Sequence, residues 1–158
     1  MPEIELDRID RRILQELQRD GRLSNQALAE RVALSPSPCL RRVKRLEELG
    51  VIRQYTALLD PEKVGFGLTG FIEVRLQKHA GGSHSPITEF TRDVQTWPEV
   101  IQCYATTGDM DYLLRVHVRD LAHFSRFALD TLMHHPSVVD MRSSFILKEI
   151  KNTTVLEV

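Results

Sequence analysis

The segment from Ser24 to Leu49 constrains the fold most, because its pattern predicts two helices joined by a tight turn. Ser24 or Asn25 can cap the first helix, and the short turn Leu34–Ser35 leads directly into the second. In the second helix Ser35 can cap, and Pro36 suits the first helical position, where its missing N–H costs nothing. The segment is therefore predicted to be a helix-turn-helix.

The second of these helices separates its charged residues from its apolar stripe. The predicted inward stripe consists of Leu40, Val43 and Leu46. The opposite side, at about 100° per residue, carries Ser37, Arg41 and Lys44, with Arg45 nearby. The net charge of -1 gives no global argument for nucleic acid, but four positive charges fall within positions 41–45 with no acid among them. This basic stripe predicts a phosphate-contacting surface, although a stripe standing alone fits a solvated helix face better.

The flanking segments complete a small module over residues 1–59. A preceding helix is expected between a cap at Asp7 and a stop at Gly21. After Gly50, the stretch Val51–Leu59 predicts a short β-ribbon, so the module is predicted to be a winged helix-turn-helix. In such a module one helix reads the major groove of double-stranded DNA while flanking polar groups hold phosphates. The expected DNA contacts are Ser24, Asn25, Ser35, Ser37, Pro38, Arg41, Arg42, Lys44, Arg45 and Arg53.

The remainder predicts a linker over residues 60–67 and a second module over residues 68–158. Strand patterns occupy 68–78, 100–107, 112–118 and 138–150, with helices beginning near Ile87 and after Asp120. The order β-α-β-β-α-β is that of the ferredoxin-like (ACT-like) fold, an antiparallel sheet with two helices on one face, so the whole chain is α+β. A second copy is expected to cover the other sheet face, which gives the two-fold symmetry that palindromic DNA sites require.

Three stretches resemble the family of the leucine-responsive regulatory protein and AsnC, also called feast/famine regulators. Residues 6–52, which include the helix SPSPCLRRVKRLE, are similar to the family's DNA-reading head almost position for position. The hairpin TGDMDYLLRV and the terminal SSFILKEIKNTT are similar to its effector module, so the resemblance covers nearly the whole chain. It implies an amino-acid-responsive transcription regulator, built of homodimers that assemble further, with an octamer expected here. It also implies an effector held between neighbouring dimers, against the hairpin turn.

The hairpin GDMD has a chemistry that suits a zwitterionic amino acid. A carboxylate can hold the ammonium group, and free backbone N–H groups can hold the carboxylate. Gly and Asp are equally the ordinary residues of hairpin turns, and the resemblance favours the binding role for Asp111, less securely for Asp109. The expected effector site comprises Ala105, Thr107, Gly108, Asp109, Asp111, Leu121, Ser143 and Ser144. Leucine, methionine or another apolar amino acid is the expected effector, as an effector and not a cofactor.

Other classes of protein find less support in the sequence. No apolar run is long enough for a bilayer span and the N-terminal residues do not resemble a secretory signal, so no membrane partner and a cytoplasmic, nucleoid-associated location are expected. Cys39 and Cys103 lack metal-ligand spacing and are expected to be reduced and structural. The six histidines form no metal or catalytic motif, so neither a metal site nor an enzyme is expected. The remaining alternative is a ligand-independent architectural DNA-binding protein, since wrapping DNA needs no effector.

Overall fold

The computed structural model describes residues 4–77 and 85–158, and these form two compact units. The first unit combines residues 1–58 with residues 150–158, and the second comprises Leu59–Glu149. The segment 150–158 thus packs with the first unit, whereas the sequence assigned it to the second module. Within the described residues, no helix is long and apolar enough to cross a lipid bilayer.

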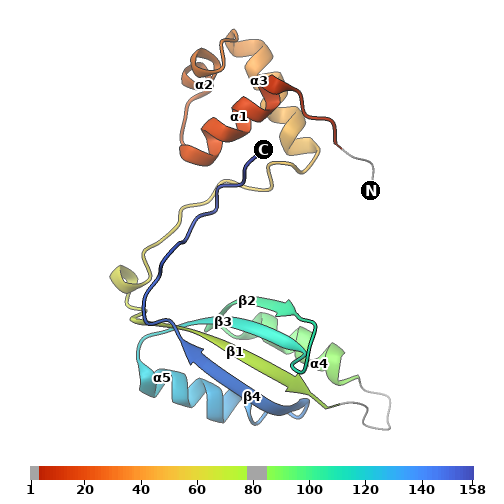
Figure 1. Cartoon of the computed structure of the whole chain (residues 1–158), viewed down its shortest axis with the longest axis vertical. Helices are drawn as coiled ribbons and strands as arrows, with labels where there is room; N and C mark the ends of the chain where they lie inside the picture. The colour runs from red at the N-terminus through yellow and green to blue at the C-terminus, as the bar shows by residue number, and fades with distance from the viewer. Residues whose placement is uncertain (1–3, 78–84) are drawn as a thin grey trace. The chain divides into compact units, whose positions relative to one another are not determined.

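The first unit is built on three helices, α1 (Arg8–Arg19), α2 (Asn25–Arg31) and α3 (Pro36–Glu48) (Figure 1). Asp7 caps α1 by accepting the backbone N–H groups of Ile9 and Asp10, and Ser24 caps α2 by accepting that of Ala27. Ser35 occupies the cap position of α3 without a side-chain hydrogen bond. The caps thus lie where their residue types favour them, because short polar side chains satisfy the free N–H groups of a helix start.

The core of the first unit comes from all three helices, and α3 faces it through a different stripe from the expected one. Cys39 and Leu46 are fully buried, whereas Leu40 is 43 % exposed. The expected stripe placed Leu40 inward and is wrong at that position. Cys39 is one helical step away and is small enough to pack against the buried Ile13, Leu28 and Val32.

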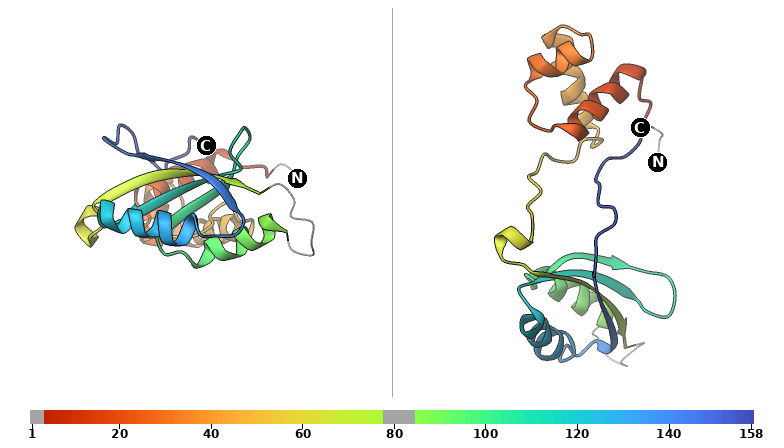
Figure 2. Two further views of the ribbon diagram at one scale, coloured as in Figure 1. Left: turned by 90° about the horizontal axis from the view of Figure 1, so that it is seen from below. Right: turned by 60° about the vertical axis from the view of Figure 1, so that its left-hand side comes forward.

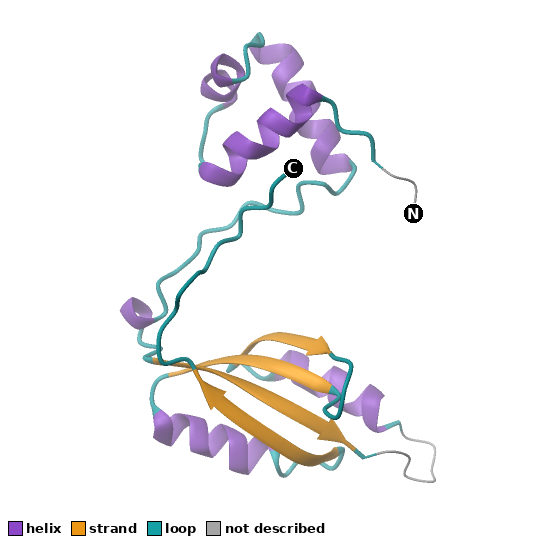
Figure 3. Ribbon diagram, in the orientation of Figure 1, coloured by secondary structure: helices purple, strands orange, loops and turns teal. Residues whose placement is uncertain are grey.

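Residues 51–60 form an extended segment without any strand, so the β-ribbon expected at Val51–Leu59 is absent (Figure 3). Val51 and Ile52 pack against the helical core, and their backbone N–H groups donate to the carbonyl of Leu46. Tyr55 donates its hydroxyl proton to Oε1 of Glu47 at 3.0 Å. The segment is therefore fixed to the C-terminal half of α3 by packing, by two backbone hydrogen bonds to Leu46 and by the Tyr55 side chain, and not by a ladder of strand bonds.

The second unit contains a four-stranded antiparallel sheet of order β2-β3-β1-β4. Its strands are β1 (Leu68–Leu76), β2 (Val100–Ala105), β3 (Tyr112–Val118) and β4 (Val138–Phe145). The buried residues of β1 and β3 alternate with exposed or half-buried ones, as one covered sheet face requires. Strand β4 ends at Phe145, five residues before the expected end at Ile150, and residues 146–158 continue without strand structure.

Both helices of the second unit lie on the same face of its sheet (Figure 2). Helix α4 (Pro86–Asp93) continues as a short 3-10 turn, Val94–Thr96, and α5 (Leu121–Arg126) continues as a π-helix, Phe127–Leu132. Phe90, Phe127 and Leu132 bury against the strand residues Ile72 and Leu114. The ferredoxin-like arrangement is confirmed, and no helix of residues 59–77 and 85–149 covers the second face of the sheet.

Candidate nucleic-acid interface and effector site

The exposed side of α3 carries the polar and basic residues that could meet DNA. Ser37, Arg41 and Lys44 are all exposed, and they lie on the side opposite the buried Cys39 and Leu46. An α-helix with a basic outer face and a braced inner face has the dimensions to enter a major groove. The half-exposed Leu40 lies on the same side, and its apolar surface could contact a thymine methyl group.

Two of the four basic residues of α3 point back to α1. Nη1 of Arg42 lies 2.8 Å from Oδ1 of Asp10 and 2.7 Å from Oδ2 of Asp7, and Nη1 of Arg45 lies 3.1 Å from Oδ2 of Asp10. The Asp10 side chain is 1 % exposed, so these guanidinium groups compensate a buried charge. The pKa of Asp7 is lowered, first by the backbone N–H of Asp10 and then by Arg42. Arg42 and Arg45 thus orient α3 on α1. The presence of four basic residues within positions 41–45 did not reveal this role.

The turn between α2 and α3 is braced by Asn25. Its Nδ2 donates to the backbone carbonyl of Pro36 at 2.8 Å, and its half-buried side chain fixes the angle between the helices. Ser24 uses its hydroxyl oxygen as the α2 cap. Ser35 and Arg53 are exposed, and Pro38 is half-buried. Of the expected DNA contacts, the structure therefore gives Asn25, Arg42 and Arg45 bracing partners and leaves Ser35, Ser37, Arg41, Lys44 and Arg53 exposed.

The hairpin between β2 and β3 is anchored to the end of β1 by Asp111. Its Oδ2 accepts the backbone N–H of Leu76 at 2.7 Å, and its own N–H donates to the carbonyl of Val74 at 2.8 Å. This contact coincides with the shift in pairing of β1 with β4 between Arg75 and Leu76. Thr107, Gly108 and Asp109 form the exposed turn, and Gly108 has a φ of 117°, which favours glycine. Asp111 therefore holds the hairpin in place whatever else it binds.

A cavity of about 370 Å³ lies beside this hairpin. Its size falls within the range of small-molecule sites, and most of its wall is apolar. It is lined by Leu76, Gln77, Ser85, Pro86, Ile87, Ala105, Asp111 and Tyr112. Two of the expected effector residues, Ala105 and Asp111, thus meet in one cavity.

The other expected effector residues lie outside that cavity. Leu121 begins α5, at the opposite end of β3 from the hairpin. Ser143 and Ser144 lie on β4 and pair with Ile72 and Phe71, so the sheet order places them at the edge opposite β2. Within one chain these three residues cannot share a pocket with Ala105.

The apolar wall of the cavity escaped the sequence reasoning. Leu76 ends a strand, Tyr112 begins one, and Pro86 and Ile87 open α4, so each had an adequate structural explanation. The sequence offered no signal for Ile87, because its 58 % exposure at the start of α4 is visible only in the structure. An apolar side chain in the first turn of a helix can lean over the neighbouring strand end.

Histidines and cysteines of the described residues have structural surroundings. His123 lies 3.0 Å from Glu99, and the buried His135 lies 3.3 Å from Asp93 and packs edge-on against Phe90. No group of three His, Cys, Asp or Glu side chains in residues 4–77 and 85–158 could hold a metal ion. Burial raises the pKa of both Cys39 and Cys103, which keeps the thiols protonated. His79 and His84 lie outside the described residues.

Family models account for both units. A winged helix-turn-helix DNA-binding model matches residues 6–53, and an Lrp/AsnC ligand-binding domain model matches residues 69–156. The chain belongs to the Lrp/AsnC family. It is therefore a DNA-binding transcriptional regulator with an amino-acid-binding domain.

Individual relatives support this family assignment over almost the full length of the chain. The leucine-responsive regulatory proteins of Escherichia coli K12 and Salmonella typhimurium are each 43 % identical over 155 residues, covering 98 % of this chain and 93 % of theirs. A transcriptional regulator of Neisseria meningitidis, solved as a complex with L-Met, is 53 % identical with a TM-score of 0.91. An AsnC family regulator of Agrobacterium tumefaciens is 41 % identical with a TM-score of 0.86. Each of these two structural matches covers 96 % of this chain and 96 % of the solved chain. These relatives are transcriptional regulators and not enzymes.

Proposed function

We propose that this regulator binds an apolar amino acid beside the β2–β3 hairpin and that L-methionine is its effector. The observation that carries the proposal is the cavity beside Asp111, in a chain 53 % identical to a regulator solved with L-Met. Bound effector then changes the assembly of the protein or its affinity for DNA. The site of action is the nucleoid in the cytoplasm.

The lining of the cavity suits the three parts of such a ligand. Oδ1 of Asp111 can accept the ammonium group while Oδ2 keeps its bond to Leu76. Backbone N–H groups of the turn Thr107–Asp109, which follows Ala105 in the chain but does not line the cavity, can meet the carboxylate where it projects from the cavity. Leu76, Ile87 and Tyr112 offer apolar surface to a thioether or aliphatic side chain. Leu121, Ser143 and Ser144 would reach the effector from a neighbouring copy, in keeping with an effector held between dimers.

For DNA, we propose a narrower set of contacts than the sequence suggested. Ser37, Arg41 and Lys44 meet the major groove or its phosphates from α3, and Ser35, Pro38 and Arg53 flank them. Ser24 contacts phosphate through the exposed start of α2. The bonds of Asn25, Arg42 and Arg45 within the head give these three residues a bracing role instead.

Assembly is proposed to begin at the helix-free face of the sheet. This face carries complementary charges on β1 and β4, including the 2.9 Å pair of Arg75 with Asp140, beside the half-buried Phe71 and Leu113. A second copy related by a two-fold axis can match such a face with itself. Further association of these dimers would give the octamer, and sedimentation velocity would measure it.

The effector proposal is tested by calorimetric titration with all twenty amino acids. L-Methionine should give saturable heat, and an apolar relative such as L-leucine a weaker one. Asp111→Asn is the sharpest variant, because an asparagine oxygen can still accept from Leu76 while the charge for the ammonium group is lost. Asp130→Asn, at an exposed position of the π-helix, is the matched control and should bind as wild type. Silence for every amino acid would favour the architectural alternative.

A further inference from the structure

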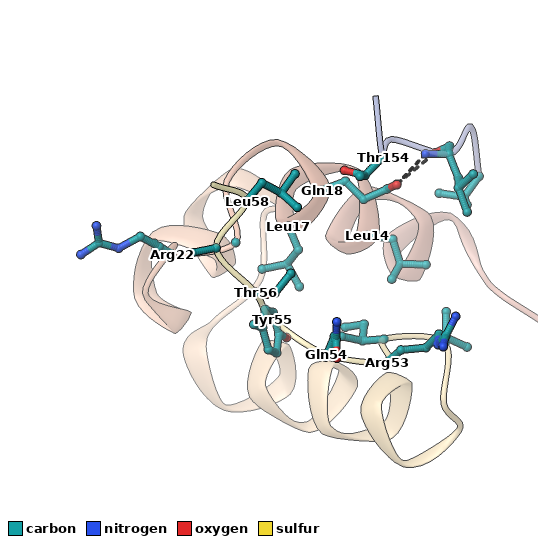
Figure 4. A pocket seen from close by; sticks show the side chains of 16 residues that line it. Leu14, Leu17, Gln18, Arg22, Arg53, Gln54, Tyr55, Thr56, Leu58 and Thr154 are labelled. Carbon is teal, nitrogen blue, oxygen red and sulfur yellow. Dashed lines mark hydrogen bonds between the residues drawn. The ribbon is translucent and has the colours of Figure 1, made fainter. Parts of the chain in front are cut away.

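A groove on the first unit lies between α1, residues 51–58 and the segment 154–158 (Figure 4). Its volume is about 730 Å³, and it is lined mainly by apolar surface from Leu14, Leu17, Val51, Ile52 and Leu58. All of these residues belong to the unit that carries the recognition helix α3. The groove is therefore a feature of the DNA-reading head, separate from the cavity beside Asp111.

One side chain of α1 binds the main chain of segment 154–158 in both directions. Oε1 of Gln18 accepts the backbone N–H of Leu156 at 2.6 Å, and Nε2 of Gln18 donates to the carbonyl of Leu156 at 3.0 Å (Figure 4). Nε2 of Gln15 donates to the carbonyl of Val158 at 3.3 Å. Paired bonds of this kind reproduce those that an edge strand offers to an added strand.

The packing of the segment agrees with recognition of its main chain. The side chain of Leu156 is 71 % exposed, so it contributes little to the contact. Val158 packs against the buried core of the head, alongside Val51 and Ile52. The segment is thus held by two backbone-reading glutamines and one apolar anchor.

We infer that α1 is a receptor for an extended main chain and that the peptide it holds is the segment 154–158, which forms one wall of the groove. The segment continues from β4, the edge strand of the effector-binding unit, so its docking connects that strand to the reading head. Docking transmits the state of the effector unit to the DNA-reading head; this second step rests on the proposed response to methionine. Release of the segment uncouples the two units without altering either binding site.

The docking is tested by hydrogen exchange of the full chain, without effector or DNA. Gln18→Met keeps the length of the side chain and removes both hydrogen bonds, whereas Leu156→Pro removes the donor from the segment and leaves the head unchanged. Gln18→Met should speed exchange of the Leu156 amide, which donates to the head, about tenfold. Both variants should also lower the {1H}–15N NOE of the neighbouring Val155 and Glu157 amides, because the segment becomes more mobile. Gln95→Met and Lys151→Pro, at exposed positions, are the matched controls and should exchange as wild type. Wild-type NOE values for Val155 and Glu157 in Leu156→Pro would overturn the docking, even where Gln18→Met fails to fold.

Transmission is tested with the same variants by measuring DNA affinity with and without L-methionine. Wild type should show a change in affinity on adding methionine, and Leu156→Pro should lose that change while still binding methionine in calorimetry. A change of wild-type size in Leu156→Pro would overturn the transmission. Absence of methionine binding in wild type would instead overturn the proposed function, and the exchange measurement would still decide the docking.

Discussion

Asp10 of α1 and Arg42 of α3 are joined by a 2.8 Å bond between Oδ1 and Nη1, at a carboxylate that is 1 % exposed. Arg42→Leu removes a charged donor from this buried group and leaves Arg45 as its remaining guanidinium partner. The variant should lower the free energy of unfolding by about 1.5–3 kcal/mol, measured by urea unfolding. Arg41→Leu, at an exposed position of the same helix, should stay within about 0.5 kcal/mol of wild type. Equal losses from both variants would remove the distinction between bracing and exposed arginines.

The exposed basic residues should instead govern affinity for DNA. Arg41→Ala or Lys44→Ala should weaken operator binding by about 1–3 kcal/mol, because each removes a contact to a base edge or a phosphate. Fluorescence anisotropy over a range of salt concentrations measures this, and a lost phosphate contact also reduces the salt dependence. Thermal unfolding should match wild type, which separates a binding defect from a folding defect. Unchanged affinity at both low and moderate salt would place the DNA on another surface.

These two predictions mark what the sequence of α3 could and could not reveal. Periodicity and capping located the helix, since Pro36 and Gly50 bound it in sequence and in structure. They could not choose between Cys39 and Leu40 for the core, because neighbouring residues differ by one helical step of about 100°. For the same reason the sequence did not show whether Arg42 lies on the outer face of α3 or on the face toward α1. The rotation of the helix was fixed by Asp10, a partner 32 residues away.

The second unit shows the same limit at longer range. The strand bounds Tyr112–Val118 were predicted residue for residue, because apolar and polar residues alternate from Leu114 to Val118 after the GDMD turn. The cavity was anticipated only through Ala105 and Asp111, since its apolar wall comes from β1 and α4, elements distant in sequence. The docking of residues 154–158 on α1 left no local signal, because Gln18 is an ordinary surface residue of an amphipathic helix.

Asp111 should stabilise the β2–β3 hairpin in addition to its proposed role in binding the effector. Asp111→Ala leaves the backbone N–H of Leu76 without its partner, and a half-buried donor so orphaned should cost about 1–3 kcal/mol. Asp111→Asn can restore the bond and should recover most of that loss. Hydrogen exchange of the β1 peptides measures the difference, and exchange in Asp111→Ala should be fastest near Leu76. Indistinguishable β1 exchange in the two variants would show that the bond contributes nothing to the hairpin.

Tyr55 should make the stability of the reading head fall at alkaline pH. Partial burial, followed by the bond to Glu47 and the charge of that carboxylate, raises the pKa of Tyr55 to about 12. The folded state therefore keeps the phenol proton where the unfolded chain, with a pKa near its ordinary value of 10.0, has begun to lose it. This stabilisation is present in full below the unfolded pKa and is lost as the pH rises through the folded pKa.

Spectrophotometric titration of wild type and Tyr55→Phe checks this assignment. A phenolate transition near pH 12 should be present in wild type and absent from the variant, against the background of Tyr104 and Tyr112. Urea unfolding at about pH 9 and about pH 11 should then show a larger loss of stability in wild type than in Tyr55→Phe. Equal losses would mean that Tyr55 ionises alike in both states, and that its hydroxyl does not hold the 51–58 segment on α3.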